Sequence, residues 1–158
     1  MYGIASFNTP NYPVLFKNQG HFKFEDVTAA SGLAKLPPTY QAAWADFKHD
    51  GRMDLVTGGK LFVNQCLPKH WLEVRLHGDG KHVNRSAIGA QVRVLLKDKT
   101  LTRQVEAGTG EGNQNDLTLH FGLGEIGGTM HLEIFWPNKK TEIIKHVRCD
   151  QIIDLSYK

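Results

Sequence analysis

Apolar and polar residues alternate along several stretches of the second half of the chain. The clearest alternating runs are 72–76, 92–96, 117–123 and 130–136. A period of two residues is typical of strands that bury one face. Glycine-rich and polar turns separate these runs at 78–80, 97–99, 108–110, 124–128 and 137–138. Short strands at this spacing predict a small β-sandwich or barrel.

The alternation also predicts the core. The side chains that we expect to be mostly buried are Trp44, Phe47, Leu55, Leu72, Val74, Val92, Val94, Leu119, Phe121, Leu132, Ile134 and Trp136. Helical periodicity is almost absent, and the one candidate is a short turn at 26–31 that Gly32 would end. If residues 124–128 close a hairpin, His120 and Glu133 would face each other on its outer surface.

Composition and charge narrow the class of protein. Hydrophobic residues make up 41% of the 158 residues and charged residues 22%, as in globular proteins. The Lys and Arg residues behind the net charge of +3 are scattered, so we expect no nucleic-acid partner. The apolar runs are too short for a membrane span, and the N-terminus has no signal-peptide pattern. Cys66 and Cys149 belong to no CxxC pattern, and either one bridge or two thiols fits the sequence.

A loop at 46–54 carries the acidic residues with the clearest chemistry. Its carboxylates are those of Asp46, Asp50 and Asp54, each four residues from the next. Spaced carboxylates of this kind are what a hard cation such as Ca²⁺ requires, and Arg52 would add only its backbone carbonyl.

Lys48 stands where a further oxygen ligand is expected in this loop. An ammonium about 4 Å from a divalent cation is repelled by several kcal/mol, even at an effective dielectric of about 20. Lys48 either swings outward, so that calcium binds weakly, or it neutralises the carboxylates itself. We favour the second interpretation, a degenerate calcium loop without a metal, and expect no other cofactor.

Leu61-Phe62-Val63-Asn64 echoes Leu15-Phe16-Lys17-Asn18, which is a weak internal repeat. With the loop at 46–54 between the two copies, the segment 12–59 resembles the FG-GAP/VCBS repeats of integrin-type propellers. The resemblance implies a propeller-like blade with a calcium loop. A closed propeller needs about four or more blades, and this segment supplies material for about one.

Four motifs follow one another between residues 70 and 137. They are His70-Trp71-Leu72-Glu73-Val74-Arg75-Leu76, Asn84-Arg85-Ser86-Ala87-Ile88-Gly89-Ala90, Leu119-His120-Phe121-Gly122-Leu123-Gly124 and Trp136-Pro137. They make the segment from residue 70 to about residue 155 similar to the ASPIC/UnbV domain. This resemblance implies a calcium-binding propeller ahead of the domain, an extracellular or cell-surface location, and no defined enzymatic activity.

Pattern and resemblance together predict an all-β chain, with one propeller-like blade packed on a small β-sandwich or barrel domain. The expected parts are an N-terminal extension at 1–11, an FG-GAP/VCBS-like blade at 12–66 and an ASPIC/UnbV-like domain at 67–158. A lone blade has bare edges, so we expect it to pack on the second domain with Trp44 or Trp71 near the interface. A homodimer would cover the blade edges that this packing leaves exposed.

The first functional hypothesis is a non-enzymatic binding or adhesion module that recognises a protein or a glycan. Loop amides and a guanidinium beside an aromatic ring suit a sugar, and the candidate ligand residues are Trp71, Asn84, Arg85, Asn113 and Gln114. In the other interpretation, these polar groups bind no ligand and form hydrogen bonds only within their own loops. The alternative is a carbohydrate-active or other hydrolytic enzyme with a site on the sandwich loops, and the sequence assigns no catalytic residue to it.

Overall fold

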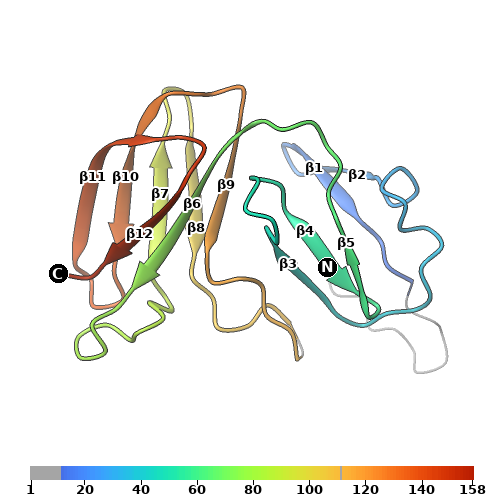
Figure 1. Cartoon of the computed structure of the whole chain (residues 1–158), viewed down its shortest axis with the longest axis horizontal. Helices are drawn as coiled ribbons and strands as arrows, with labels where there is room; N and C mark the ends of the chain where they lie inside the picture. Colours follow the sequence, from blue (N-terminus) through green and yellow to red (C-terminus); the bar gives the residue numbers. More distant parts are fainter. Residues whose placement is uncertain (1–11, 111) are drawn as a thin grey trace.

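The computed structural model describes residues 12–110 and 112–158, and this part of the chain is all-β, as predicted (Figure 1). Its strands are β1 (Phe16–Gly20), β2 (Lys23–Asp26), β3 (Ala42–Ala45), β4 (Asp54–Thr57), β5 (Lys60–Phe62), β6 (His70–His77), β7 (Gln91–Leu95), β8 (Thr100–Gln104), β9 (Leu119–Gly124), β10 (Thr129–Phe135), β11 (Thr141–Arg148) and β12 (Ile152–Ser156). They form four small sheets, none of which closes into a barrel. The described residues contain no helix long and apolar enough to cross a membrane.

Two of the sheets form a sandwich, with strand orders β11-β10-β7-β8 and β12-β6-β9. Their inward side chains form one buried cluster that includes Leu72, Val92, Phe121 and Ile134. Every core residue predicted from Leu55 onward is buried. From Leu72 onward, the two-residue period places alternate side chains between the two sheets.

The core prediction was less accurate in the loop region before Leu55. Trp44 is only half-buried, and the prediction for Phe47 is wrong, since its side chain is 70% exposed. Phe47 lies two residues after the end of β3, in the loop at 46–54, so the alternation of a strand no longer fixes the direction of its side chain.

The connection at 124–128 is not a hairpin turn. β9 pairs with β6, whereas β10 pairs with β7 and β11, so the chain passes here from one sheet to the other. The predicted facing of His120 and Glu133 is therefore wrong. His120 lies opposite Glu73 instead, and Glu133 lies opposite Arg93. The alternation identified these strands correctly, but it carries no information about which strands pair.

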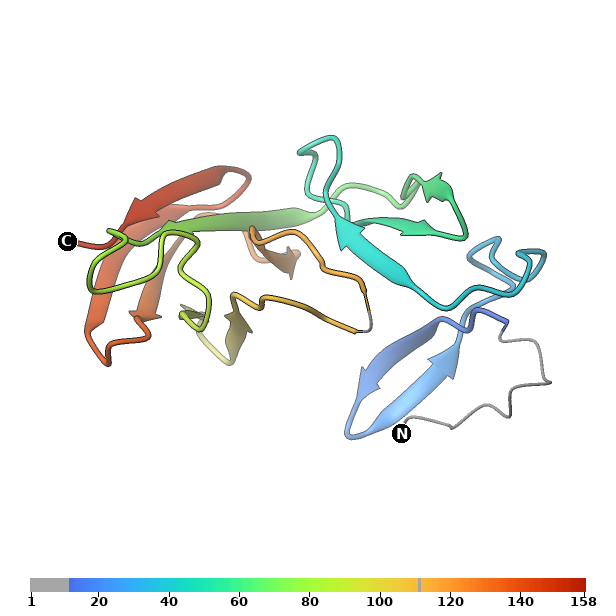
Figure 2. The ribbon, with the colours of Figure 1, turned by 90° about the horizontal axis from the view of Figure 1, so that it is seen from below.

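Residues 12–66, called the blade below, form the β1-β2 hairpin and the β3-β4-β5 sheet (Figures 1 and 2). They lie beside the sandwich, and the residues after 66 are called the sandwich domain. Leu33, Leu36 and Leu55 form a small buried cluster of their own. The predicted helical turn near residue 26 is a pair of tight turns without a helix, in which Ser31 N–H donates to Val27 O at 2.9 Å. Gly32 has the expected left-handed backbone, with φ +75°.

The two parts are joined by a hydrogen-bonded interface, as predicted. The backbone of Trp44 in β3 accepts a hydrogen bond from Asp116 N–H at 3.1 Å and donates one to Asn115 Oδ1 at 2.9 Å. Trp71 at the start of β6 packs against Gly51 of the loop at 46–54. A segment of the sandwich domain thus covers the β3 edge of the blade and gives the backbone groups of Trp44 at that edge hydrogen-bond partners.

Candidate functional site

The acidic loop at 46–54 uses two of its carboxylates internally. Asp46 is buried, and its carboxylate accepts hydrogen bonds from the backbone N–H groups of Asp50 and Gly51. Asp54 is also buried and accepts from Phe47 N–H at 3.2 Å and from Asn64 N–H at 2.7 Å. Because these bonds satisfy donors that the tight loop leaves without partners, the two residues have a structural role in the loop.

Asp50 is held by a counter-charge that sequence reasoning missed. The Arg52 guanidinium folds back onto the Asp50 carboxylate, with Nε at 3.0 Å from Oδ1. This contact holds the pKa of Asp50 below its ordinary value. Lys48 Nζ lies farther away, at 3.9 Å from Asp50 Oδ2. A planar guanidinium makes two parallel bonds to a carboxylate where an ammonium makes one, so Arg52 is the closer partner.

The loop in this arrangement does not fit a calcium ion. Calcium takes 6–8 oxygen ligands at about 2.3–2.6 Å, so its ligand oxygens must lie close together. Among the described residues, Asp46, Asp50 and Asp54 are not a set whose ligand atoms all lie within 4.8 Å of one another. Their oxygens are instead directed at backbone N–H groups and at Arg52.

A buried carboxyl lies where the loop meets β6. The Glu73 side chain is buried, and its Oε2 has no hydrogen-bond partner. The nearest opposite group is the ring of His49, with Nδ1 at 3.6 Å from Oε2. Burial and the neighbouring Asp46 carboxylate raise the pKa of Glu73, and His49 offsets part of this rise. The carboxyl is therefore a polar group that the interface tolerates at a cost in stability.

A cavity of about 520 Å³ lies between the two parts, with Glu106, Asp116 and His120 among its lining residues. His120 Nε2 lies 2.8 Å from Gly51 O, which places its N–H on that carbonyl, and burial lowers the pKa of the ring. Asp116 Oδ1 accepts a hydrogen bond from Thr118 N–H at 3.0 Å. Both side chains are thus engaged in holding loops.

The predicted ligand residues lie in three places. Trp71 is at the start of β6, and Asn84 and Arg85 lie beyond the other end of that strand. Asn113 donates a hydrogen bond to Ala42 O, at the end of β3 away from the loop at 46–54 that Trp71 contacts. Asn84 closes its own turn, with Oδ1 accepting from Ile88 N–H at 2.8 Å.

Arg85 and Gln114 complete this set. The Arg85 side chain packs beside Gly80, and Gln114 is exposed. Trp71 and Asn113 thus contact the blade at different places, and Asn84 and Arg85 lie beyond the far end of β6 from Trp71. A ligand-binding role for the five stays a prediction.

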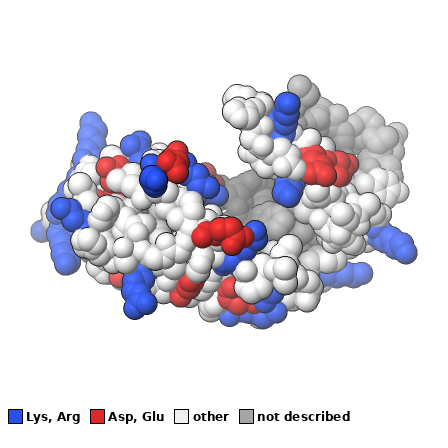
Figure 3. All heavy atoms as spheres, turned by 90° about the horizontal axis from the view of Figure 1, so that it is seen from above, with Lys and Arg blue, Asp and Glu red and all other residues white. Residues whose placement is uncertain are grey.

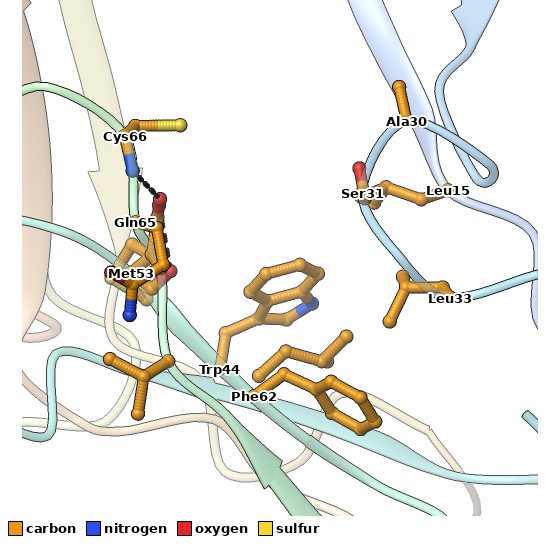
Figure 4. Close-up of a pocket in the computed structure, with 12 residues that line it drawn as sticks. Leu15, Ala30, Ser31, Leu33, Trp44, Met53, Phe62, Gln65 and Cys66 are labelled. Atoms are coloured by element: carbon orange, nitrogen blue, oxygen red, sulfur yellow. Dashed lines mark hydrogen bonds between the residues drawn. The ribbon is translucent and has the colours of Figure 1, made fainter.

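An apolar pocket of about 440 Å³ lies in the blade (Figure 4). Trp44 and Phe62 from the β3-β4-β5 sheet face Leu15 and Leu33 across it. Cys66 lies at its rim, and both cysteines are free thiols in this structure. The sequence did not indicate this pocket, because its two walls are residues far apart in the chain.

Figure 3 shows basic and acidic side chains mixed over the visible face, without a patch of a single sign. The fold and these sites define a protein of two joined all-β parts, in which a small blade-like sheet packs on a β-sandwich. The family model described as ASPIC and UnbV matches residues 80–158, half of the chain. The chain belongs to the ASPIC and UnbV family. No curated protein matches it.

Proposed function

We propose that this protein is a non-enzymatic binding module, and that it takes up an extended strand of a protein partner at the outer edge of β5. The observation that carries the proposal is a difference between two equivalent strands. β1 pairs with β2 along its length, whereas no strand of residues 12–110 and 112–158 pairs with the outer edge of β5.

The equivalence of β1 and β5 rests on more than the repeated sequence. Asn18 Oδ1 accepts a hydrogen bond from Gly20 N–H at 2.8 Å, and Asn64 Oδ1 accepts one from Cys66 N–H at 2.9 Å. The same short turn thus follows each copy. This supports the interpretation of residues 12–66 as FG-GAP/VCBS-like material, in which β1-β2 ends one repeat and β3-β4-β5 begins the next. In that scheme the partner strand would take the place beside β5 that β2 takes beside β1.

The backbone of β5 is suited to this role. Thr57 and Lys60 flank the two-residue turn at 58–59, so they form the hydrogen-bonded pair that closes the hairpin. The next pair, Val56 and Leu61, is then a non-hydrogen-bonded pair, and the N–H and C=O of Leu61 point away from β4. Outward-pointing N–H and C=O groups of this kind are what strand addition uses.

The side chains near this edge favour an apolar partner. Phe62 of β5 and residues 63–66 after it line the apolar pocket, so an added strand would direct side chains toward it. The exposed large hydrophobic residues also gather in this half of the chain: Tyr12, Val14, Phe16, Phe22, Phe24, Tyr40, Phe47, Val56, Leu61 and Leu67. From residue 68 onward, the exposed large hydrophobic residues among the described residues are only Ile88, Ile126 and Ile143. Apolar surface concentrated in this way is typical of an interaction site.

A labelled peptide copying residues 21–28 is the first probe, because its β2 sequence is the strand that the repeat places beside β1. We expect it to bind the whole chain, and a copy with both phenylalanines replaced by serine to bind at least tenfold more weakly. Leu61→Pro removes the outward N–H of β5 and should abolish binding, whereas the matched Leu61→Thr keeps it and should bind. The proposal would be contradicted if Leu61→Pro and Leu61→Thr bound the peptide equally well. It would also be contradicted if the chain bound a glycan on an array and no peptide with alternating apolar and polar residues.

A further inference from the structure

Three side chains with metal-ligating atoms meet where β6 begins. His70 Nδ1 lies 2.7 Å from Asp150 Oδ2, and Cys149 Sγ lies 3.2 Å from the same oxygen. Sγ and Nδ1 are 3.7 Å apart. Among the residues that the structure describes, these three form the one group of at least three His, Cys, Asp or Glu residues whose ligand atoms all lie within 4.8 Å of one another.

We propose that His70, Cys149 and Asp150 bind a divalent transition-metal ion of the zinc type, with one coordination position left open. The site is separate from the β5 edge and does not depend on the strand-binding function proposed above. Thiolate, imidazole and carboxylate together suit a borderline-soft ion, and they disfavour calcium, which prefers oxygen alone.

The distances between the three atoms are close to those that a tetrahedral ion imposes. Zinc bonds of about 2.0–2.3 Å to N, O and S keep such donors roughly 3.3–3.6 Å apart. Each observed separation differs from this by about 0.7 Å or less, which small side-chain rotations supply. The closest pair, His70 and Asp150, is held by a hydrogen bond whose proton the ion would replace.

Backbone contacts hold the donors in place. Asp150 N–H donates to Trp71 O at 2.7 Å, and Trp71 N–H donates to Asp150 Oδ1 at 3.1 Å, which leaves Oδ2 directed at the other two donors. Cys149 N–H donates to Gly128 O at 3.0 Å. A Cβ at Gly127 would lie only 2.8 Å from His70 Nε2, so the glycine makes room for the ring. Asp150 also has φ +60°, an uncommon conformation for a residue other than glycine.

The Asp150 carboxylate supplies negative charge at the site. Of the basic side chains that line the flanking hollows, Lys69 is paired with Glu125 at 2.7 Å, and Arg148 lies beside Cys149 and Asp150. The pKa of the Cys149 thiol is raised by burial and by Asp150. Binding forms the S–metal bond as the thiol proton leaves to solvent, and the proton of the His70–Asp150 hydrogen bond leaves to solvent as well, so that Nδ1 and Oδ2 can both bind the ion.

The site is open to solvent on two sides. Hollows of about 300 and 390 Å³ flank it, and Asp150 lines both of them. The side chains of His70 and Asp150 are 43% and 44% exposed. An ion can therefore enter, and water or an external ligand can take the fourth position.

The test is a Co²⁺ titration of the reduced, tag-free chain, followed by competition with Zn²⁺. We expect one equivalent of Co²⁺ to produce a thiolate-to-cobalt charge-transfer band and the visible bands of a tetrahedral ion, and Zn²⁺ to displace it. Ca²⁺ at the same concentration should leave the spectrum unchanged. Cys149→Ser should lose the charge-transfer band, and its Co²⁺ affinity should fall roughly 100-fold.

Two control variants separate this site from general metal binding. Cys66→Ser removes the other free thiol, which lies outside the cluster, and should titrate like the parent. His77→Gln breaks a similar His–Asp pair without a thiol, between β6 and β12, with Nε2 at 2.7 Å from Asp154 Oδ1. It should also be unaffected, whereas His70→Gln should weaken binding at least tenfold. Absence of the band in the parent, its loss in Cys66→Ser, or its survival in Cys149→Ser would each overturn the proposal.

Discussion

The indole of Trp71 lies so close to Gly51 that a Cβ atom added at residue 51 would overlap the ring. Gly51 also has a left-handed backbone, with φ +81°, and its carbonyl accepts the hydrogen bond from His120. One residue of the blade loop thus contacts two strands of the sandwich domain, β6 and β9. The missing side chain is what allows the two parts to approach each other.

Gly51→Ala should separate the blade from the sandwich domain. The matched control is Gly59→Ala, since Gly59 has a similar φ of +71° but no neighbour within 4 Å of an added Cβ. Both changes carry the backbone strain, about 1 kcal/mol or more, and only Gly51→Ala adds the overlap with Trp71. Limited proteolysis should cleave the blade of Gly51→Ala much faster than that of Gly59→Ala. Equal cleavage rates would show that this contact does not hold the interface.

Glu73→Gln should stabilise the protein at neutral pH. The pKa of Glu73 is raised above its ordinary value of 4.5, chiefly by burial and by Asp46, so the folded state favours the protonated carboxyl. The stability that this group contributes is complete below pH 4.5 and is lost as the pH rises through the folded pKa. The amide keeps the shape without the charge, so its advantage in melting temperature should be clear at pH 7 and vanish near pH 4. The exposed Glu106 supplies the control, because Glu106→Gln should show no such difference between the two pH values.

Lys48→Asp should create calcium-dependent stability that the parent lacks. The change removes a cation beside Asp50 and supplies the missing oxygen ligand of the loop. Because Arg52 also binds Asp50, the double variant with Arg52→Ser should respond more strongly. At a calcium concentration of about 100 times Kd the gain is about 2.7 kcal/mol, measurable by thermal melting with and without chelator. Lys60→Asp makes the same charge change outside the loop and should give no calcium response. A parent that is itself stabilised by micromolar calcium would show that the loop is not degenerate.

The strands of the sandwich were predictable because their alternation is local. Leu72 and Val74, or Leu132 and Ile134, show which face is buried within a few residues of sequence. Which strands pair was not predictable, since β9 and β10 are neighbours in the chain but lie in different sheets.

The candidate sites were harder to predict from the sequence than the strands. His70 and Cys149 are brought together by the parallel pairing of β12 with β6, which no sequence spacing signals. The Arg52 side chain was missed because the loop pattern assigns that position by its backbone alone. The acidic loop itself was visible, since its residues are close in sequence.

Phe121→Ala should unfold or strongly destabilise the sandwich domain. Phe121 lies in β9 with no exposed surface and is one of the largest fully buried side chains of the described residues. Its removal leaves a cavity between two sheets whose strands cannot easily close it, so the expected loss is roughly 3–5 kcal/mol in the free energy of unfolding. Phe22→Ala is the natural control, because Phe22 is 97% exposed and its loss should change stability by less than about 0.5 kcal/mol. Urea denaturation of the three proteins measures both effects. A wild-type midpoint for Phe121→Ala would mean that the inward and outward faces of β9 have been exchanged, and that the pairing of β9 with β6 has to be revised.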